Sequence, residues 1–213
     1  MYGELRTGNR RSEILSQASR LFAEHGYEGA AIRLIARASG VTEAAIYRHF
    51  DSKAHLYEEV IRAKARQHDI QGYLGEFKGQ GTMQDILMRV ATHILDLAAK
   101  DPELVRLTTY SGLEEDQSGS TLFQEIRLPY IEHIRDEIQS RMDSGEVRDV
   151  DPFITGRCFV GMVMDCALSA SVWAKATGIE FNAETVVCNN VPIFARGLCN
   201  HPPTPCERQT DGV

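Results

Sequence analysis

Apolar residues recur at intervals of three and four along most of the chain, and no segment shows sustained alternation of apolar and polar residues. A period near 3.6 is that of an α-helix with one buried face. The pattern therefore predicts an all-α fold. The predicted helices cover residues 10–25, 31–38, 43–49, 53–70, 83–100, 102–112, 120–143, 152–176 and 183–199.

Residues that favour caps and turns mark the ends of the first helices. Gly26 predicts the end of the first helix, since glycine readily adopts the backbone that terminates a helix. Thr42 is a favourable N-cap for the third helix, and Asp51 or Ser52 for the fourth. The early helices are therefore short and closely spaced.

Prolines mark several later boundaries. Asp101 and Asp151 each precede a proline, which places a capping carboxylate before the first turn of a helix. Pro129 lies inside a helical pattern and predicts a kink or a break between two short helices. Residues 201–213 are polar and rich in proline, which is typical of a disordered tail.

The segment "AAIRLIARASGVTEAAIYRHF" (30–50) contains two short helical patterns joined by a turn at Gly40. Two such helices are the signature of a helix-turn-helix, whose second helix enters the major groove of DNA. With Ala45 and Ile46 turned inward, polar residues of the second helix face outward. The alternative interpretation is a small helical core with a solvated polar face.

The DNA hypothesis assigns a role to each outward residue. Tyr47, Arg33 and Lys53 are expected to contact phosphate, whereas Arg48 is expected to influence base preference. The residues predicted to face DNA are Arg33, Thr42, Glu43, Ala44, Tyr47, Arg48, His49 and Lys53.

Residues 10–56 resemble the DNA-binding domain of the TetR family of bacterial transcriptional regulators. The resemblance rests on "LFAEHGYEGAAIRLIARASGVTEAAIYRHFDSKAHL" and on the spacing of its glycines, aromatic and aliphatic residues. It implies a larger helical domain that binds a small-molecule inducer. It also implies homodimers in which the helices near 152–176 and 183–199 pair into a four-helix bundle.

The sequence departs from the family pattern at two places. Ala30 and Ala31 stand where the family usually has Thr or Ser, and the lost cap costs about 1 kcal/mol. Glu43 stands where the family often has Lys or Arg, and a carboxylate there repels phosphate. A second class of function is therefore considered: a helical interaction module, or an activator, with weakened DNA binding.

Charge is distributed unevenly between the two ends of the chain. Residues 1–67 contain 11 Lys and Arg against 8 Asp and Glu, although the whole chain contains 23 and 30. A mildly basic head on an acidic body suggests that only the head meets a polyanion. The odd number of cysteines, 5 in all, argues against a disulfide framework and favours the reducing cytoplasm. No apolar run is long enough for a membrane span.

Residues 153–178 are mostly apolar around the whole helical circumference, which fits a helix covered by its own domain and by a partner subunit. Asp165 is the one acidic residue in its interior. We expect Asp165 to pair with Arg127 or Arg157, and contact with a ligand is the alternative.

An apolar effector site is expected within the body. The residues predicted to line it are Phe77, Leu87, Tyr110, Phe123, Tyr130, Phe159, Met162 and Trp173. An ordinary core is the alternative role for each of them. His133 with Glu137, and His93 with Asp96, have helical metal-ligand spacing, but without a third ligand we expect surface pairs and no metal site.

Known catalytic and cofactor motifs are absent from the sequence, so neither an enzyme nor a cofactor is predicted. The predicted organisation is a helix-turn-helix domain over 1–56, a ligand-binding and dimerisation domain over 57–200, and a tail over 201–213. The predicted function is that of a transcriptional regulator, most simply a repressor. Its expected partners are a near-palindromic double-stranded DNA operator, a second copy of the chain and an unidentified small-molecule effector.

Overall fold

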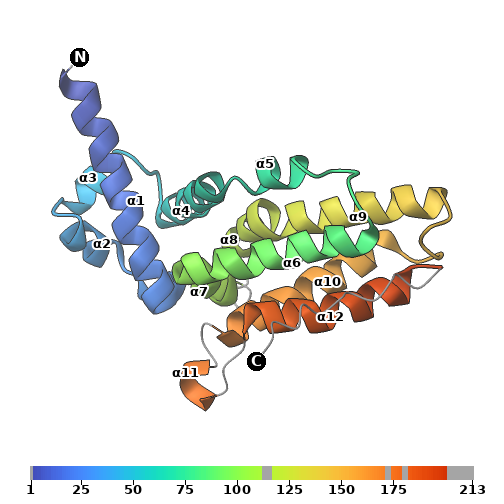
Figure 1. The fold of residues 1–213 in the computed structure, drawn as a ribbon. Coiled ribbons are helices and arrows are strands. Elements are labelled where there is room, and N and C mark those ends of the chain that lie inside the picture. The colour runs from blue at the N-terminus through green and yellow to red at the C-terminus, as the bar shows by residue number, and fades with distance from the viewer. Residues whose placement is uncertain (1, 112–116, 171–173, 179–181, 201–213) are drawn as a thin grey trace.

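The computed structural model describes residues 2–111, 117–170, 174–178 and 182–200. Four helices make a head at one end of the molecule (Figure 1), and the fourth leads into the body. They are α1 (Tyr2–Gly29), α2 (Ile32–Ala38), α3 (Glu43–Tyr47) and α4 (Lys53–His68).

The body is a bundle in which the long helices α6, α9, α10 and α12 run side by side (Figure 1). Its helical segments are α5 (Ile70–Gly75), α6 (Met83–Lys100), α7 (Pro102–Ser111), α8 (Gln117–Leu122), the π-helical η1 (Phe123–Arg127), α9 (Leu128–Asp143), α10 (Pro152–Leu168), α11 (Ala174–Thr177) and α12 (Ala183–Leu198). The described residues contain no strand beyond an isolated bridge between Val147 and Cys199. The all-α prediction is confirmed.

Buried aliphatic and aromatic side chains form one core that runs from the head into the body. In the head, the rings of Phe22 and Tyr57 meet edge to face with centroids 4.9 Å apart, which fastens α1 to α4. In the body, helix α6 buries most of one face, including Ile86 and Val90. Because α4 belongs to both parts of this core, it ties the orientation of the head to the body.

Several helix starts follow the predicted caps. The Thr42 hydroxyl accepts a hydrogen bond from the Ala45 amide at 3.2 Å, and Ser52 caps α4 by accepting from His55 N at 3.0 Å. Asp151 accepts from the amide of Ile154 at 2.8 Å. Each side chain satisfies an amide that the first turn of a helix leaves without a partner.

Other helix boundaries differ from the prediction. Helix α1 begins well before residue 10, and its break falls at Gly26, whose backbone has φ 71° and ψ 175°. Asp69 ends α4 with a left-handed φ of 41°, and its carboxylate caps α5 at Gly72, so a short helix occupies part of the glycine-rich segment. Helix α10 keeps α-helical geometry as far as Leu168, and Ser169 and Ala170 follow it in π-helical geometry.

The predicted break near Pro129 takes the form of a π-helical turn. Residues 123–127 widen the helix, and α9 then begins at Leu128 with Pro129 in its first turn. The amide of Leu128 donates to the carbonyl of Phe123 in this wider turn, and Pro129, which has no amide hydrogen, follows it. The chain therefore continues through this region in a helical course and places Arg127 at the end of the π-helical turn.

A buried ion pair between Glu137 and Arg141 fastens the loop between α5 and α6 to helix α9. Glu137 also accepts a hydrogen bond from Gly79 N at 2.6 Å, and Arg141 donates to the Gly81 carbonyl at 2.8 Å. The surface pair that the spacing of His133 and Glu137 suggested is therefore wrong. Both residues are buried, and Glu137 serves the loop.

No helix within the described ranges is both long and apolar enough to cross a membrane.

Candidate nucleic-acid interface

Helices α2 and α3 form a helix-turn-helix whose turn runs through Ser39, Gly40 and Val41. Gly40 has a φ of 62°, which a residue with a side chain adopts only with strain. The Val41 amide donates to the carbonyl of Ala36 at 2.9 Å, which closes the turn against the end of α2. The fully buried Ile35 and Ile46 hold the two helices on the head core.

Helix α3 presents a polar face that no other part of the described chain covers. Thr42, Glu43, Ala44, Tyr47 and Arg48 are all exposed, and Tyr47 keeps 49% of its surface accessible. Because Ile46 is buried and Ala45 is partly covered, the other residues of this segment point away from the core. The structure thus brings five of the predicted contact residues onto one surface.

Arg33 and His49 occupy the margins of this surface. Arg33 is exposed on α2, on the helix that precedes the turn. His49 follows α3 and is half-buried, with its ring tilted 57° to that of Phe50 at a centroid distance of 6.3 Å. Helix α2 lacks a side-chain cap at Ala31, in agreement with the departure noted in the sequence.

Lys53 is engaged within the head. Its Nζ donates to the carbonyl of Glu28 at 3.2 Å and lies 4.5 Å from the centroid of the Tyr27 ring. Both contacts join the start of α4 to the end of α1. In this arrangement Lys53 positions the helices that carry the surface.

Arg11 is a residue that sequence reasoning missed. Its guanidinium lies 5.1 Å from the centroid of the Phe50 ring, just beyond α3, and its Nη2 donates to Glu59 of α4 at 2.6 Å. The hydrogen bond from Arg11 is the main cause of a lowered pKa at Glu59, and Arg62 adds to it. The basic pair Arg10 and Arg11 near the start of the chain was the available signal, but the partner of Arg11 lies 48 residues away.

A polar cluster joins the head to the body at the junction of α1, α4 and α7. Lys64 of α4 donates to both oxygens of Asp101 at 2.8 Å and to Glu103 at 3.1 Å, and Ser19 of α1 donates to Glu103 at 2.8 Å. Nε2 of His68 lies 2.9 Å from Asp101. Burial opposes ionisation of Asp101, but the bonds from Lys64 and His68 outweigh it, so its pKa is lowered.

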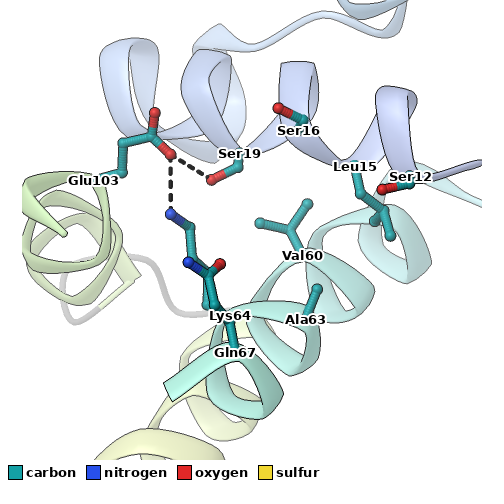
Figure 2. Close-up of a pocket in the computed structure, with 9 residues that line it drawn as sticks. All are labelled: Ser12, Leu15, Ser16, Ser19, Val60, Ala63, Lys64, Gln67 and Glu103. Carbon is teal, nitrogen blue, oxygen red and sulfur yellow. Dashed lines mark hydrogen bonds and ion pairs between the residues drawn. The ribbon is translucent and has the colours of Figure 1, made fainter.

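Figure 2 shows the cleft that opens beside this cluster between α1 and α4, with Glu103 bonded to Ser19 and Lys64 at one end. The cleft has a volume of about 210 Å³ and a mixed polar and apolar lining. Its lining residues are Ser12, Leu15, Ser16, Ser19, Val60, Ala63, Lys64, Gln67 and Glu103.

The residues predicted to line an effector site are dispersed through the body. Phe77, Leu87, Tyr130 and Phe159 are buried in the continuous core, and Trp173 lies outside the described residues. Half-buried positions are occupied by Tyr110, Phe123 and Met162.

Two further clefts are present in the body. One, of about 520 Å³, lies between α6 and α12 beside Met88 and Cys188, and the other, of about 400 Å³, lies beside Tyr73 and His93. Neither is lined by any of the eight predicted residues.

His93 is part of a stacked aromatic group. Its ring stacks on Tyr73 at a centroid distance of 3.8 Å, and its Nδ1 lies 2.9 Å from the Tyr130 hydroxyl. Burial lowers the pKa of His93, so the neutral form is favoured. Because His93 contacts Tyr73 and Tyr130, the surface pair expected with Asp96 does not form. The described residues contain no cluster of metal ligands.

Helices α10 and α12 carry exposed apolar residues on the body. Phe153, Ile154 and Ile193 keep 40%, 59% and 66% of their surface accessible. A Cβ at Gly161, further along α10, would meet no atom within 4 Å. These helices are the two that were predicted to pair with a second copy.

The helix-turn-helix head and the helical body together define a DNA-binding transcriptional regulator. Residues 14–60 match the family model of the bacterial regulatory proteins of the tetR family. The transcriptional repressor KstR2 of Rhodococcus jostii is 30% identical over 90% of this chain and 92% of its own length. The repressor AcnR of Corynebacterium glutamicum is 28% identical over 79% of this chain and 85% of its own.

The chain therefore belongs to the TetR family, which confirms the predicted resemblance and identifies a regulator, as opposed to an enzyme.

Solved structures share the whole architecture. The regulator FadR from Bacillus subtilis, in complex with stearoyl-CoA, superimposes with a TM-score of 0.72 at 19% identity over 87% of this chain and 98% of its own. AibR, in complex with isovaleryl coenzyme A and operator DNA, gives a TM-score of 0.67 at 22% identity over 86% and 97%. At these identities the likeness shows the fold.

Proposed function

We propose that the protein is a cytoplasmic repressor that binds a near-palindromic operator as a homodimer and is released by a small amphipathic ligand. The head, residues 1–56, reads DNA, and the body, residues 57–200, binds the ligand and the second copy. The observation that carries this proposal is the exposed polar face of α3, held on the core by Ile46. A helix of this kind fits the major groove.

The contacts to DNA divide into two groups. Tyr47 and Arg33, both exposed, bond phosphate oxygens and set the register of the head on the duplex. Arg48, together with Thr42 and Ala44, lies where it meets base edges. Lys53 acts through the contacts that hold α4 on α1. Glu43 reduces affinity for DNA of any sequence because its carboxylate repels phosphate.

A dimer supplies the second head that specificity requires, since one five-residue helix contacts few base pairs. The exposed Phe153, Ile154 and Ile193 supply the apolar surface that such a pairing buries. The open space around Gly161 leaves room for the backbone of a second helix to approach.

The effector is proposed to be an acyl thioester of coenzyme A or a related amphipathic anion. Support comes from two regulators of the same fold that hold stearoyl-CoA and isovaleryl coenzyme A. The half-buried Phe123 and Met162, together with Tyr110 and Trp173, are proposed to line the apolar part of the site.

The test is a titration of the purified protein against labelled DNA from the region upstream of its own coding sequence, with a random duplex as control. Specific binding at nanomolar to micromolar concentration, reversed by acyl-CoA thioesters of graded chain length, is expected. Equal affinity for operator candidates and random duplexes would reject the repressor and favour the interaction-module alternative.

A further inference from the structure

Two arginines of the body, the half-buried Arg127 and the exposed Arg157, lie close enough for the charge of one to act on the other. Arg127 ends η1, and Arg157 lies in α10 directly after Gly156. A Cβ at Gly156 would lie 3.0 Å from the carbonyl oxygen of Ile131, so α10 and α9 touch at this level. Because Ile131 follows Arg127 by about one turn, the crossing brings the two arginines to neighbouring positions.

Arg127 is not compensated by any group in the described structure. Its Nε is enclosed and has no hydrogen-bond partner, and neither Arg127 nor Arg157 forms an ion pair with a described residue. The predicted partner, Asp165, is exposed and pairs with neither, so that prediction is wrong. Burial, followed by the charge of Arg157, lowers the pKa of Arg127.

A buried N–H group of a charged side chain costs free energy unless it donates a hydrogen bond to an acceptor. A guanidinium presents five N–H donors in a planar fork that matches the oxygens of a phosphate or a carboxylate. Arg127 also stands at the end of a π-helical turn, a deviation that is frequent at functional sites. The pair thus has the chemistry of an anion site.

The segment that carries Arg127 is linked to the head by charged side chains. Glu125 of η1 lies 3.9 Å from Nε of Arg62 in α4, and Arg62 donates to Glu59 at 3.2 Å. Glu59 in turn accepts from Arg11, whose guanidinium lies over Phe50 beside the recognition helix. A shift of η1 therefore acts on the helix that joins body and head.

We propose that Arg127 and Arg157 together bind the acidic group of the effector, a phosphate or a carboxylate. The role of that ligand as effector rests on the proposed function, whereas the binding itself does not. The bound anion supplies the acceptors that Arg127 lacks and moves η1 relative to α4.

The experiment compares the full chain with Arg127→Met and Arg157→Met, which keep an apolar stem and remove the guanidinium. Arg106→Met is the matched control, since Arg106 is an exposed arginine of α7. Affinity is measured by calorimetry at constant ionic strength for three probes. Coenzyme A carries phosphates, octanoate carries a carboxylate, and octanoyl-pantetheine carries no anion.

The full chain is expected to bind at least one of the two anionic probes, coenzyme A or octanoate, and Arg106→Met should bind that probe with the same affinity as the full chain. The probe that binds shows whether the anion is a phosphate or a carboxylate. Each variant at Arg127 or Arg157 is expected to lose about tenfold or more in that affinity. Octanoyl-pantetheine should bind all four proteins alike. Failure of both anionic probes to bind the full chain, or equal affinity in all four proteins, would overturn the proposal.

Stability of the ligand-free protein provides a second readout. Arg127→Met should melt at or above the temperature of the full chain, because it removes an uncompensated charge. If it melts lower and sedimentation shows dissociated monomers, a carboxylate of the second copy completes the pair and the proposal fails. Both measurements omit DNA, so loss of operator binding contradicts only the proposed function.

Discussion

Lys64 bonds both carboxylate oxygens of Asp101 at 2.8 Å and so joins the helix that leaves the head to the start of α7 in the body. Asp101 is only 7% exposed, and its Oδ1 also caps α7 through the amide of Leu104 at 3.2 Å. The carboxylate thus orients α4 and begins the next helix of the body. Any rotation of α4 relative to α7 must stretch this ion pair.

Lys64→Met is expected to destabilise the protein by about 3 kcal/mol at pH 7, because it removes the chief partner of a buried carboxylate. Because the folded-state pKa of Asp101 is lowered, its stabilising effect is present above the unfolded pKa near 3.8. It is lost as the pH falls through the lower folded value. Denaturant titrations from pH 7 to pH 3 should show the difference shrinking below about pH 4. Lys100→Met, at an exposed lysine, should stay within about 0.5 kcal/mol of wild type throughout.

His133 is buried with its ring against Phe77, and its Nε2 has no hydrogen-bond partner in the described structure. Burial lowers its pKa from 6.5, so the folded protein resists protonation and loses stability as the pH falls from about 6.5. His133→Phe should reduce this loss between pH 7.5 and 5, by at most about 1.4 kcal/mol per pH unit. Thermal melts across that pH range measure this loss, and His25→Gln, a substitution of an exposed histidine, is the control. Parallel curves for wild type and His133→Phe would contradict the assignment.

The elements of the head could be predicted because their signals are local. Thr42 and Ser52 each cap the helix that begins at the next residue, by accepting a hydrogen bond from the amide three residues further on. The apolar spacing around Ile46 decides which side of α3 is buried. Contacts between distant residues leave no such signal. The contact of Lys53 with the carbonyl of Glu28 could not be predicted, because that partner is 25 residues away and belongs to the backbone.

The body was predicted less well for the same physical reason. Pro129 indicated an irregularity, but a π-helical turn and a broken helix remove the same hydrogen bond and cannot be distinguished by composition. The pairing of Asp165 with an arginine was inferred from charge alone, and it fails because Asp165 lies on an exposed face. Which buried aromatic residues line a ligand site depends on packing that periodicity does not encode.

Ile193→Asp is expected to dissociate the proposed dimer, since it places a charge on the most exposed of the large apolar residues of α12. A carboxylate buried without a partner costs several kcal/mol, so the dissociation constant should rise at least about 100-fold. Sedimentation velocity from 0.1 to about 10 μM measures it. Leu34→Asp, at an exposed apolar residue of the head, should leave dimerisation unchanged. Dissociation by the head variant instead would place the interface elsewhere.

Tyr47→Phe removes only the hydroxyl of a side chain that is half exposed, so its effect on stability should be within about 0.5 kcal/mol. If the hydroxyl bonds a phosphate, affinity should fall several-fold on operator and random duplexes alike. Arg48→Ala should instead reduce the ratio of the two affinities. A binding selection from random duplexes separates the two effects, and a changed consensus for Tyr47→Phe would refute the phosphate assignment.

Glu43 is the first residue of α3, exposed on the face that we place against DNA. A negative charge at the amino end of a helix stabilises the helix by about 0.3 to 1 kcal/mol through the helix dipole. Glu43→Lys should therefore slightly destabilise the free protein. On DNA the opposite sign is expected, because a lysine there can neutralise a phosphate in each half-site. The slope of log affinity against log salt should then steepen by about 0.9 per head, on operator and random duplex alike. Glu43→Gln, which removes charge without reversing it, should lie between the two. Binding no tighter than wild type at low salt would show that α3 does not lie along the backbone as proposed. Tighter binding to random DNA combined with weaker binding to the operator would show that Glu43 reads a base, most simply the amino group of a cytosine.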